Sequence, residues 1–155
     1  MKLVQAFQEL SLEANHDWDL LLVGNGPIKA QIPNDAKIRV LDFLPPDRLA
    51  EEIRHAGVFI LPSIAEPWGV VLHEFAAAGM PLIASHDVGS ARRFLIKGYN
   101  GFLFSHQEAG YLKAQLKKMV QKTDEELLLM GARSHQLGQQ VTPELFAATV
   151  LSILN

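Results

Sequence analysis

The chain has 155 residues, of which 48% are hydrophobic and 20% charged, and this composition excludes a disordered tail or a coiled coil. A net charge of -3 argues against a nucleic-acid-binding protein, because such proteins normally carry a concentrated basic stripe. The absence of cysteine excludes disulfides, cysteine zinc sites and thiol nucleophiles. No apolar run approaches the roughly 18 residues that span a membrane.

Short apolar runs bounded by Gly, Pro and Asn predict five strands. They cover residues 19–24, 38–44, 58–62, 81–85 and 102–104. Runs of this kind are typical of strands that are buried on both faces of a parallel sheet.

Stretches with helical spacing of their apolar residues separate these strands. They cover residues 1–15, 46–56, 69–79, 90–97 and 107–121, and two further helices follow from Thr123, the second starting at Thr142-Pro143-Glu144. The alternation predicts an α/β fold, a doubly wound Rossmann-like parallel sheet with C-terminal helices. A flavodoxin-like domain is the alternative, and a bound flavin would give it a colour.

Ligands of open parallel sheets bind beyond the carboxyl ends of the strands. Gly24 and Gly26 follow the first predicted strand and would let the backbone approach a phosphate. The dinucleotide-binding fingerprint needs a third glycine where this chain has Lys29, so that fingerprint fails. A plain strand-to-helix turn explains the glycine pair as well.

The segment after the third predicted strand carries two carboxylates. Glu66 lies just before the predicted helix, and Glu74 lies inside it. The amides of residues 68–70 would be free helix-start donors, which together with carboxylates suit the hydroxyls of a sugar. The alternative is that Glu66 caps the helix and Glu74 faces solvent. The apolar neighbours of Glu74 favour a carboxylate with a partner.

The fourth strand is followed by a third candidate segment, in which the amides of Gly89 and Ser90 would meet an anion. Other chemistry does not assemble, since the six histidines lack metal-ligand spacing and no serine-hydrolase or P-loop motif is present. We expect His73 to be a structural histidine and Trp68 to pack in its loop.

Residues 63–81, with the sequence SIAEPWGVVLHEFAAAGMP, resemble a motif of the C-terminal domain of GT-B glycosyltransferases. The motif is a glutamate, seven residues, a second glutamate and a small-residue helix ending in Gly-x-Pro. It is typical of the large retaining group called family 4 or group 1. Residues 23–27, 43–46 and 100–103 match further parts of this family, and the similarity runs from about Asp19 to Val120.

The resemblance implies retaining transfer of a sugar from a nucleotide-diphosphate sugar to an acceptor, in carbohydrate biosynthesis, with electrostatic stabilisation of the leaving group. It implies that Glu66 is the catalytic residue, meeting donor-sugar hydroxyls, and that Glu74 accepts hydrogen bonds from the ribose. The donor-binding set that it implies is Gly24, Gly26, Leu44, Ser63, Trp68, Gly69, Val70, Glu74, Gly89 and Ser90. It implies no cofactor and no metal. The absence of cysteine and of a visible signal peptide favours a cytoplasmic location.

The sequence departs from the family pattern at Arg93, which occupies the place of a glutamate, and Ser90, which replaces the second of two glycines. The arginine and lysine that hold the diphosphate belong to an upstream strand that this chain lacks. We therefore expect residues 1–155 to be a single, truncated donor-binding domain without the N-terminal acceptor domain, its intramolecular partner. Such a fragment would bind its donor weakly and be inactive alone.

The acceptor stays open among a polysaccharide, a lipid-linked sugar and a small molecule, and so does peripheral membrane association of the full-length protein. We expect no nucleic-acid partner. The alternative functions are a non-catalytic nucleotide-sugar-binding module and another GT-B enzyme, such as a nucleotide-sugar epimerase.

Overall fold

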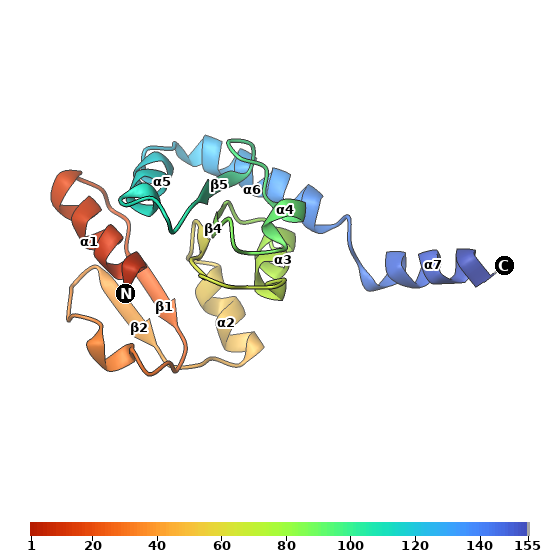
Figure 1. Ribbon diagram of the computed structural model, residues 1–155, viewed down its shortest axis with the longest axis horizontal. Coiled ribbons are helices and arrows are strands. Elements are labelled where there is room, and N and C mark those ends of the chain that lie inside the picture. Colours follow the sequence, from red (N-terminus) through yellow and green to blue (C-terminus); the bar gives the residue numbers. More distant parts are fainter. Residues whose placement is uncertain (155) are drawn as a thin grey trace. The chain divides into compact units, whose positions relative to one another are not determined.

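The computed structural model describes residues 1–154, which form two compact units (Figure 1). Each unit combines two separate segments of the chain. The first contains residues 1–56 and 107–122, and the second contains residues 57–106 and those from 123 onward. Each is described by itself, so the prediction of a single domain stays a prediction.

The first unit contains the parallel strands β1 (Leu20–Val23) and β2 (Ile38–Leu41), with Leu20 beside Ile38. Its other elements are the helices α1 (Lys2–Glu13), α2 (Pro46–Ile53) and α5 (Tyr111–Val120) and the short 3-10 helix η1 (Lys29–Gln31). The apolar stripe of α1 is buried, and α1 packs on the apolar stripe of α5.

The second unit contains the parallel sheet β3-β4-β5, with β3 at Phe59–Leu61, β4 at Leu82–Ser85 and β5 at Gly101–Phe104. All four residues of the central strand β4 are buried. The helices are α3 (Val70–Ala77), α4 (Ala91–Phe94), α6 (Asp124–Gly138) and α7 (Pro143–Leu154). The predicted α/β fold with parallel strands and flanking helices is confirmed, although α4 is shorter than the predicted helix 90–97.

The core of the second unit fixes α3 between the sheet and α6. Leu72 and Ala76 of α3 are fully buried with Leu82 and Ala84 of β4. Gly79 ends α3 with a positive φ of 81°, and the amide of Met80 donates to the carbonyl of Phe75, a Schellman motif. This confirms the predicted helix stop.

Two glycines let α6 approach α3 closely. A Cβ at Gly131 would lie 2.3 Å from the Gly79 carbonyl oxygen, and one at Gly138 would lie 2.5 Å from the Ala77 nitrogen. The two glycines are seven residues apart and therefore lie on one face of α6. The helix itself begins at a capping box, in which Thr123 and Glu126 each bind the other's backbone amide.

Candidate functional site: two loops at the ends of β3 and β4

The loop after β3 (residues 62–69) and the loop after β4 (residues 86–90) are joined by their backbones in the second unit. The amide of Glu66 donates to the Asp87 carbonyl over 3.3 Å, and the amide of Gly89 donates to the Glu66 carbonyl over 3.0 Å. The Ser90 amide donates to the Trp68 carbonyl over 2.7 Å. The loops therefore behave as one structural element, and we call these residues the site loops.

Gly89 is required by this arrangement. A Cβ at position 89 would lie 2.1 Å from the carbonyl oxygen of Pro67, which is far inside van der Waals contact. Ser90 is fully buried, and its hydroxyl donates to the Gly69 carbonyl over 2.9 Å. The amides of Gly89 and Ser90, which we expected to be free for an anion, are thus already bound to the other site loop. Their contact with a donor stays a prediction.

Glu66 lies beside the start of α3. Gly69, the residue before this helix, has a φ of 82°, and a Cβ at this position would lie 3.0 Å from Cγ of Glu66. Within residues 1–154 the amides of Trp68, Gly69 and Val70 have no hydrogen-bond acceptor. The predicted combination of a carboxylate and open helix-start amides is therefore present at one place.

Glu74 is exposed, and its carboxylate forms no hydrogen bond or ion pair with another described residue. The expectation that the apolar neighbours of Glu74 leave no solvent face at this position was wrong; its contact with a donor stays a prediction. The buried neighbours Leu72 and Ala76 lie on the opposite face of α3, whereas Val70 and Ala78, one turn away on each side of Glu74, are exposed. A carboxylate on this face is free to accept hydrogen bonds from a ligand.

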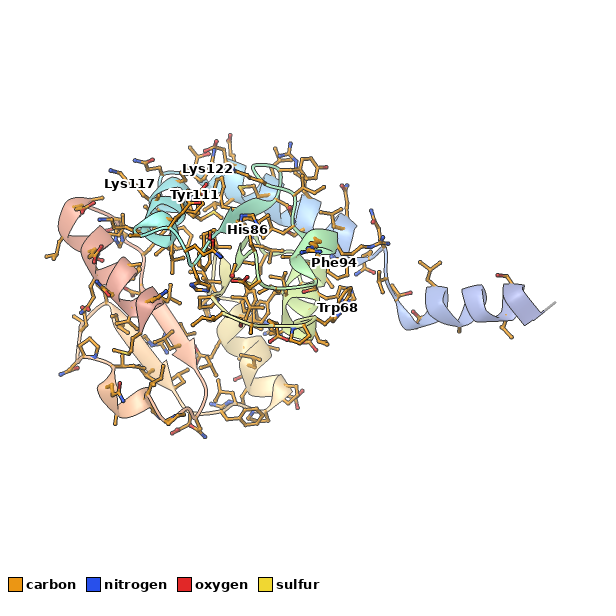
Figure 2. All side chains as sticks on the ribbon, viewed as in Figure 1. Trp68, His86, Phe94, Tyr111, Lys117 and Lys122 are labelled. Atoms are coloured by element: carbon orange, nitrogen blue, oxygen red, sulfur yellow. The ribbon has the colours of Figure 1, made fainter. Side chains whose placement is uncertain are left out.

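His73 is a structural residue, as predicted. Its ring stacks on Phe94 with 4.2 Å between the centroids, and its Nε2–H donates to the carbonyl of Gly138 over 2.9 Å. Trp68 meets the edge of the same phenylalanine at 6.4 Å but stays 49% exposed (Figure 2).

Sequence reasoning missed His106, which follows β5. Its Nε2–H donates to the carbonyl of Ser63 over 3.1 Å, and its ring meets the edge of Phe104. This contact anchors the start of the loop that carries Glu66. No sequence signal links the two positions, because they lie 43 residues apart and meet only through the parallel pairing of the sheet.

A pocket of about 510 Å³ opens on the site loops. Its charged and titratable lining residues are Glu66, His86, Asp87 and Arg92. Of these four residues, only Glu66 was expected from the sequence to have a role in the site. Ser63, Trp68, Gly69, Val70 and Glu74 belong to the same unit but do not line this pocket.

Gly24, Gly26 and Leu44 belong to the first unit. Gly24 has a φ of 141°, so its backbone alone favours glycine, whereas Gly26 has neither a positive φ nor a close neighbour at its missing Cβ. Local structure therefore explains Gly24 but does not require a glycine at position 26. Leu44 is half-buried.

The described part of the chain contains no candidate metal site and no candidate membrane span. Among residues 1–154 no group of three or more His, Cys, Asp and Glu side chains is placed to hold a metal ion. None of the described helices is long and apolar enough to span a membrane.

The sequence pattern of the family described as "Glycosyl transferases group 1" matches residues 1–136. The chain belongs to this family. The D-inositol 3-phosphate glycosyltransferase of Geodermatophilus obscurus, a relative, is 35% identical over 99 residues, which cover 62% of this chain and 21% of that protein. This chain thus spans about a fifth of that relative's length.

Solved structures support the fold of this group 1 chain. Sucrose-phosphate synthase from Thermosynechococcus elongatus superposes with a TM-score of 0.76 at 21% identity, covering 97% of this chain and 41% of that one. Anabaena Alr3699/HepE in complex with UDP-glucose superposes with a TM-score of 0.73 at 17% identity, covering 96% and 44%. The prediction of a group 1, GT-B-type C-terminal domain is confirmed.

Proposed function

We propose that this chain is the donor-binding half of a retaining glycosyltransferase, which transfers a sugar from a nucleotide-diphosphate sugar to an acceptor. One observation carries the proposal. Glu66 lies against Gly69, beside the amides of residues 68–70, which have no hydrogen-bond acceptor in the described chain. Amides at a helix start carry the positive end of its dipole and donate to oxygens. A neighbouring carboxylate accepts hydrogen bonds from hydroxyls, so the pair suits a sugar.

Glu74 provides the second contact. It lies eight residues after Glu66, on the exposed face of α3. Its carboxylate has no hydrogen-bond or ion-pair partner among residues 1–154. In our proposal the Glu74 carboxylate accepts hydrogen bonds from the ribose hydroxyls. The similar solved structure of Anabaena Alr3699/HepE in complex with UDP-glucose supports the same class of donor.

The proposed role of the site in the reaction is electrostatic. As the bond to the diphosphate breaks, negative charge grows on the leaving group and positive charge on the sugar ring. Fixed dipoles stabilise the first and a carboxylate such as Glu66 stabilises the second, without reorganising in the transition state. Retention of configuration, the absence of a metal from the reaction and the cytoplasmic location stay predictions. The class of acceptor stays open.

Titration of the 15N-labelled chain with UDP-, GDP- and ADP-glucose tests the proposal. We expect one of them to shift the amide resonances of Trp68, Gly69 and Val70, with weak affinity. Glu74→Gln should weaken this binding about tenfold, equivalent to the loss of one charge-assisted hydrogen bond. Glu125→Gln, which alters an exposed carboxylate on α6, is the matched control and should leave the affinity unchanged.

Absence of binding by all three nucleotide sugars, both to this chain and to the full-length protein, would contradict the proposal. Binding by the full-length protein without turnover of any acceptor would instead assign the chain to a sensing module.

A further inference from the structure

The pocket on the site loops carries charges of both signs on side chains from both loops and the start of α4. Glu66 and Asp87 contribute carboxylates, Arg92 contributes a guanidinium and His86 an imidazole. The volume of about 510 Å³ lies within the range of small-molecule sites. Its lining therefore presents both a cationic group and carboxylates to a ligand.

Arg92 has no carboxylate within ion-pair distance in the described part of the chain. Asp87, which lines the same pocket, instead accepts a hydrogen bond from the Ser85 hydroxyl over 3.1 Å. A guanidinium presents a planar fork of N–H donors that fits a carboxylate or a phosphate with two parallel hydrogen bonds. An unpaired guanidinium at a pocket wall is therefore an anion-binding group.

The two carboxylates restrict where an anion can lie in this pocket. Glu66 and Asp87 repel a negative group, so the position beside Arg92 is the favourable one for it. The same carboxylates accept hydrogen bonds from hydroxyl groups. The lining thus fits a molecule that combines hydroxyls with a single anionic group.

We propose that the pocket binds a sugar that carries a carboxylate or a phosphate, with Arg92 holding the anionic group and Glu66 accepting hydrogen bonds from ring hydroxyls. The part assigned to Glu66 rests on the proposed function. Such a sugar is either the moiety being transferred or the acceptor, since a uronic acid and a sugar phosphate present the same combination of hydroxyls and negative charge.

Arg93 provides a matched control. It is exposed, carries the same charge as its neighbour and does not line the pocket. A general electrostatic attraction of anions to this end of the unit would depend on both arginines equally. Binding at a specific site in this pocket would instead depend on Arg92 and not on Arg93.

The test is a titration of the 15N-labelled 155-residue chain with D-glucose, D-glucuronate, D-glucose 6-phosphate and inorganic phosphate, followed at the amides of Ala65, Gly89 and Arg92. We expect at least one anionic sugar to bind at least tenfold more tightly than glucose and than phosphate. Glucuronate and glucose 6-phosphate distinguish the two anionic groups.

Arg92→Gln should remove this preference, Arg92→Lys should retain part of it, and Arg93→Gln should bind like the wild type. Arg92 is exposed, so a wild-type spectrum of each variant away from the pocket verifies the fold. Three results would overturn the proposal. The chain could bind glucose as tightly as the anionic sugars, or it could bind inorganic phosphate more tightly than either sugar. Arg92→Gln and Arg93→Gln could also lose affinity for the anionic sugars equally.

The same titrations show which of the two proposals fails, the pocket assignment or the proposed function. If anionic sugars bind in an Arg92-dependent manner while no nucleotide sugar shifts the amides of residues 68–70, the proposed function fails and the pocket assignment stands. If nucleotide sugars bind through Glu74 while Arg92→Gln binds every probe like the wild type, the pocket assignment fails alone.

Discussion

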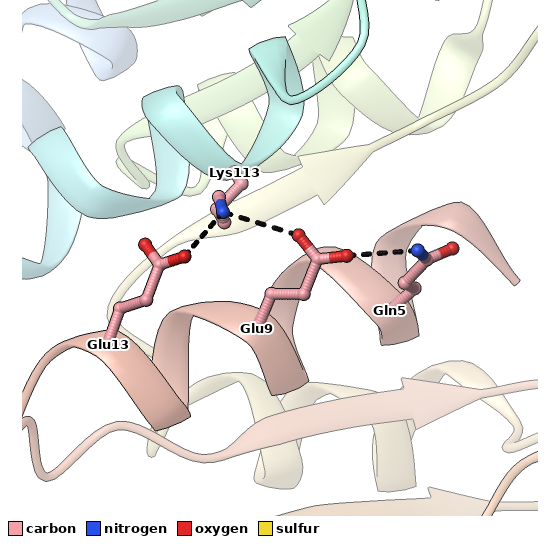
Figure 3. A network of polar contacts seen from close by, with 4 residues as sticks. All are labelled: Gln5, Glu9, Glu13 and Lys113. Carbon is pink, nitrogen blue, oxygen red and sulfur yellow. Dashed lines mark hydrogen bonds and ion pairs between the residues drawn. The ribbon is translucent and has the colours of Figure 1, made fainter.

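The site loops of the second unit and the α1–α5 pair of the first unit are held together in opposite ways. The site loops are joined by backbone hydrogen bonds and by a glycine that no larger residue can replace without displacing Pro67. The helices α1 and α5 meet through side chains, with buried apolar stripes on both helices and a network of ion pairs beside them. Lys113 of α5 lies 2.7 Å from Glu13 and 3.3 Å from Glu9, and Glu9 accepts a hydrogen bond from Gln5 (Figure 3).

This difference matters for function. Backbone contacts fix the position of a loop while leaving its side chains free, and Glu66 can therefore face a ligand although its own amide and carbonyl are bound. Contacts between exposed side chains fix little, because water and salt screen them. We expect substitutions at the two places to differ accordingly.

The largest effect should come from Gly89→Ala. The added methyl group would lie 2.1 Å from the Pro67 carbonyl oxygen, so the two loops must separate or the backbone must distort. We expect a loss of about 3 kcal/mol in the free energy of unfolding, the upper range for overpacking. Urea denaturation followed by circular dichroism measures it.

Gly26→Ala is the control for this substitution. Position 26 has open space around the missing Cβ and no positive φ, so the change in stability should stay within about 0.5 kcal/mol. Equal losses in the two variants would show that the close approach of Gly89 to Pro67 has no energetic consequence.

A smaller effect is expected for His106→Ala, which removes the hydrogen bond to the Ser63 carbonyl. We expect a loss of about 1 kcal/mol in stability, together with shifted amide resonances from Ser63 to Glu66. His106→Gln retains an N–H donor and should recover part of both. Wild-type resonances at these positions in His106→Ala would mean that the histidine does not position the loop.

The smallest effect should come from Lys113→Met. The hydrogen bond from Lys113 lowers the pKa of the Glu13 carboxyl, and that of Glu13 raises the pKa of the Lys113 ammonium. The contribution of the pair is therefore present between about pH 5 and 10. It is lost as the pH falls through the folded-state pKa of Glu13, or rises through that of Lys113.

This contribution is measured as the difference in the free energy of unfolding between the wild type and Lys113→Met. The measurement is made at 20 mM and 500 mM salt, each at pH 3 and pH 7. The two proteins should differ most at pH 7 and low salt. A difference that persists at pH 3 and high salt would mean that the lysine acts through its methylene groups rather than its charge.

The sequence predicted the order of strands and helices because short apolar runs and helical stripes have different periods. It predicted the helix start beside Glu66 for the same reason. It was wrong about Glu74 because residues adjacent in sequence lie on different faces of a helix, so apolar neighbours do not imply burial. The role of His106 and the pocket at Arg92 depend on contacts between strands, which no local pattern encodes.

The interleaved order of the two units has a consequence for synthesis. Residues 57–106 leave the ribosome before α6, whose Gly131 and Gly138 close against α3. Until then one side of α3 lacks its cover, and the segment between them, residues 107–122, belongs to the other unit. The packing of α6 on α3 can therefore be completed only after residue 138 has emerged.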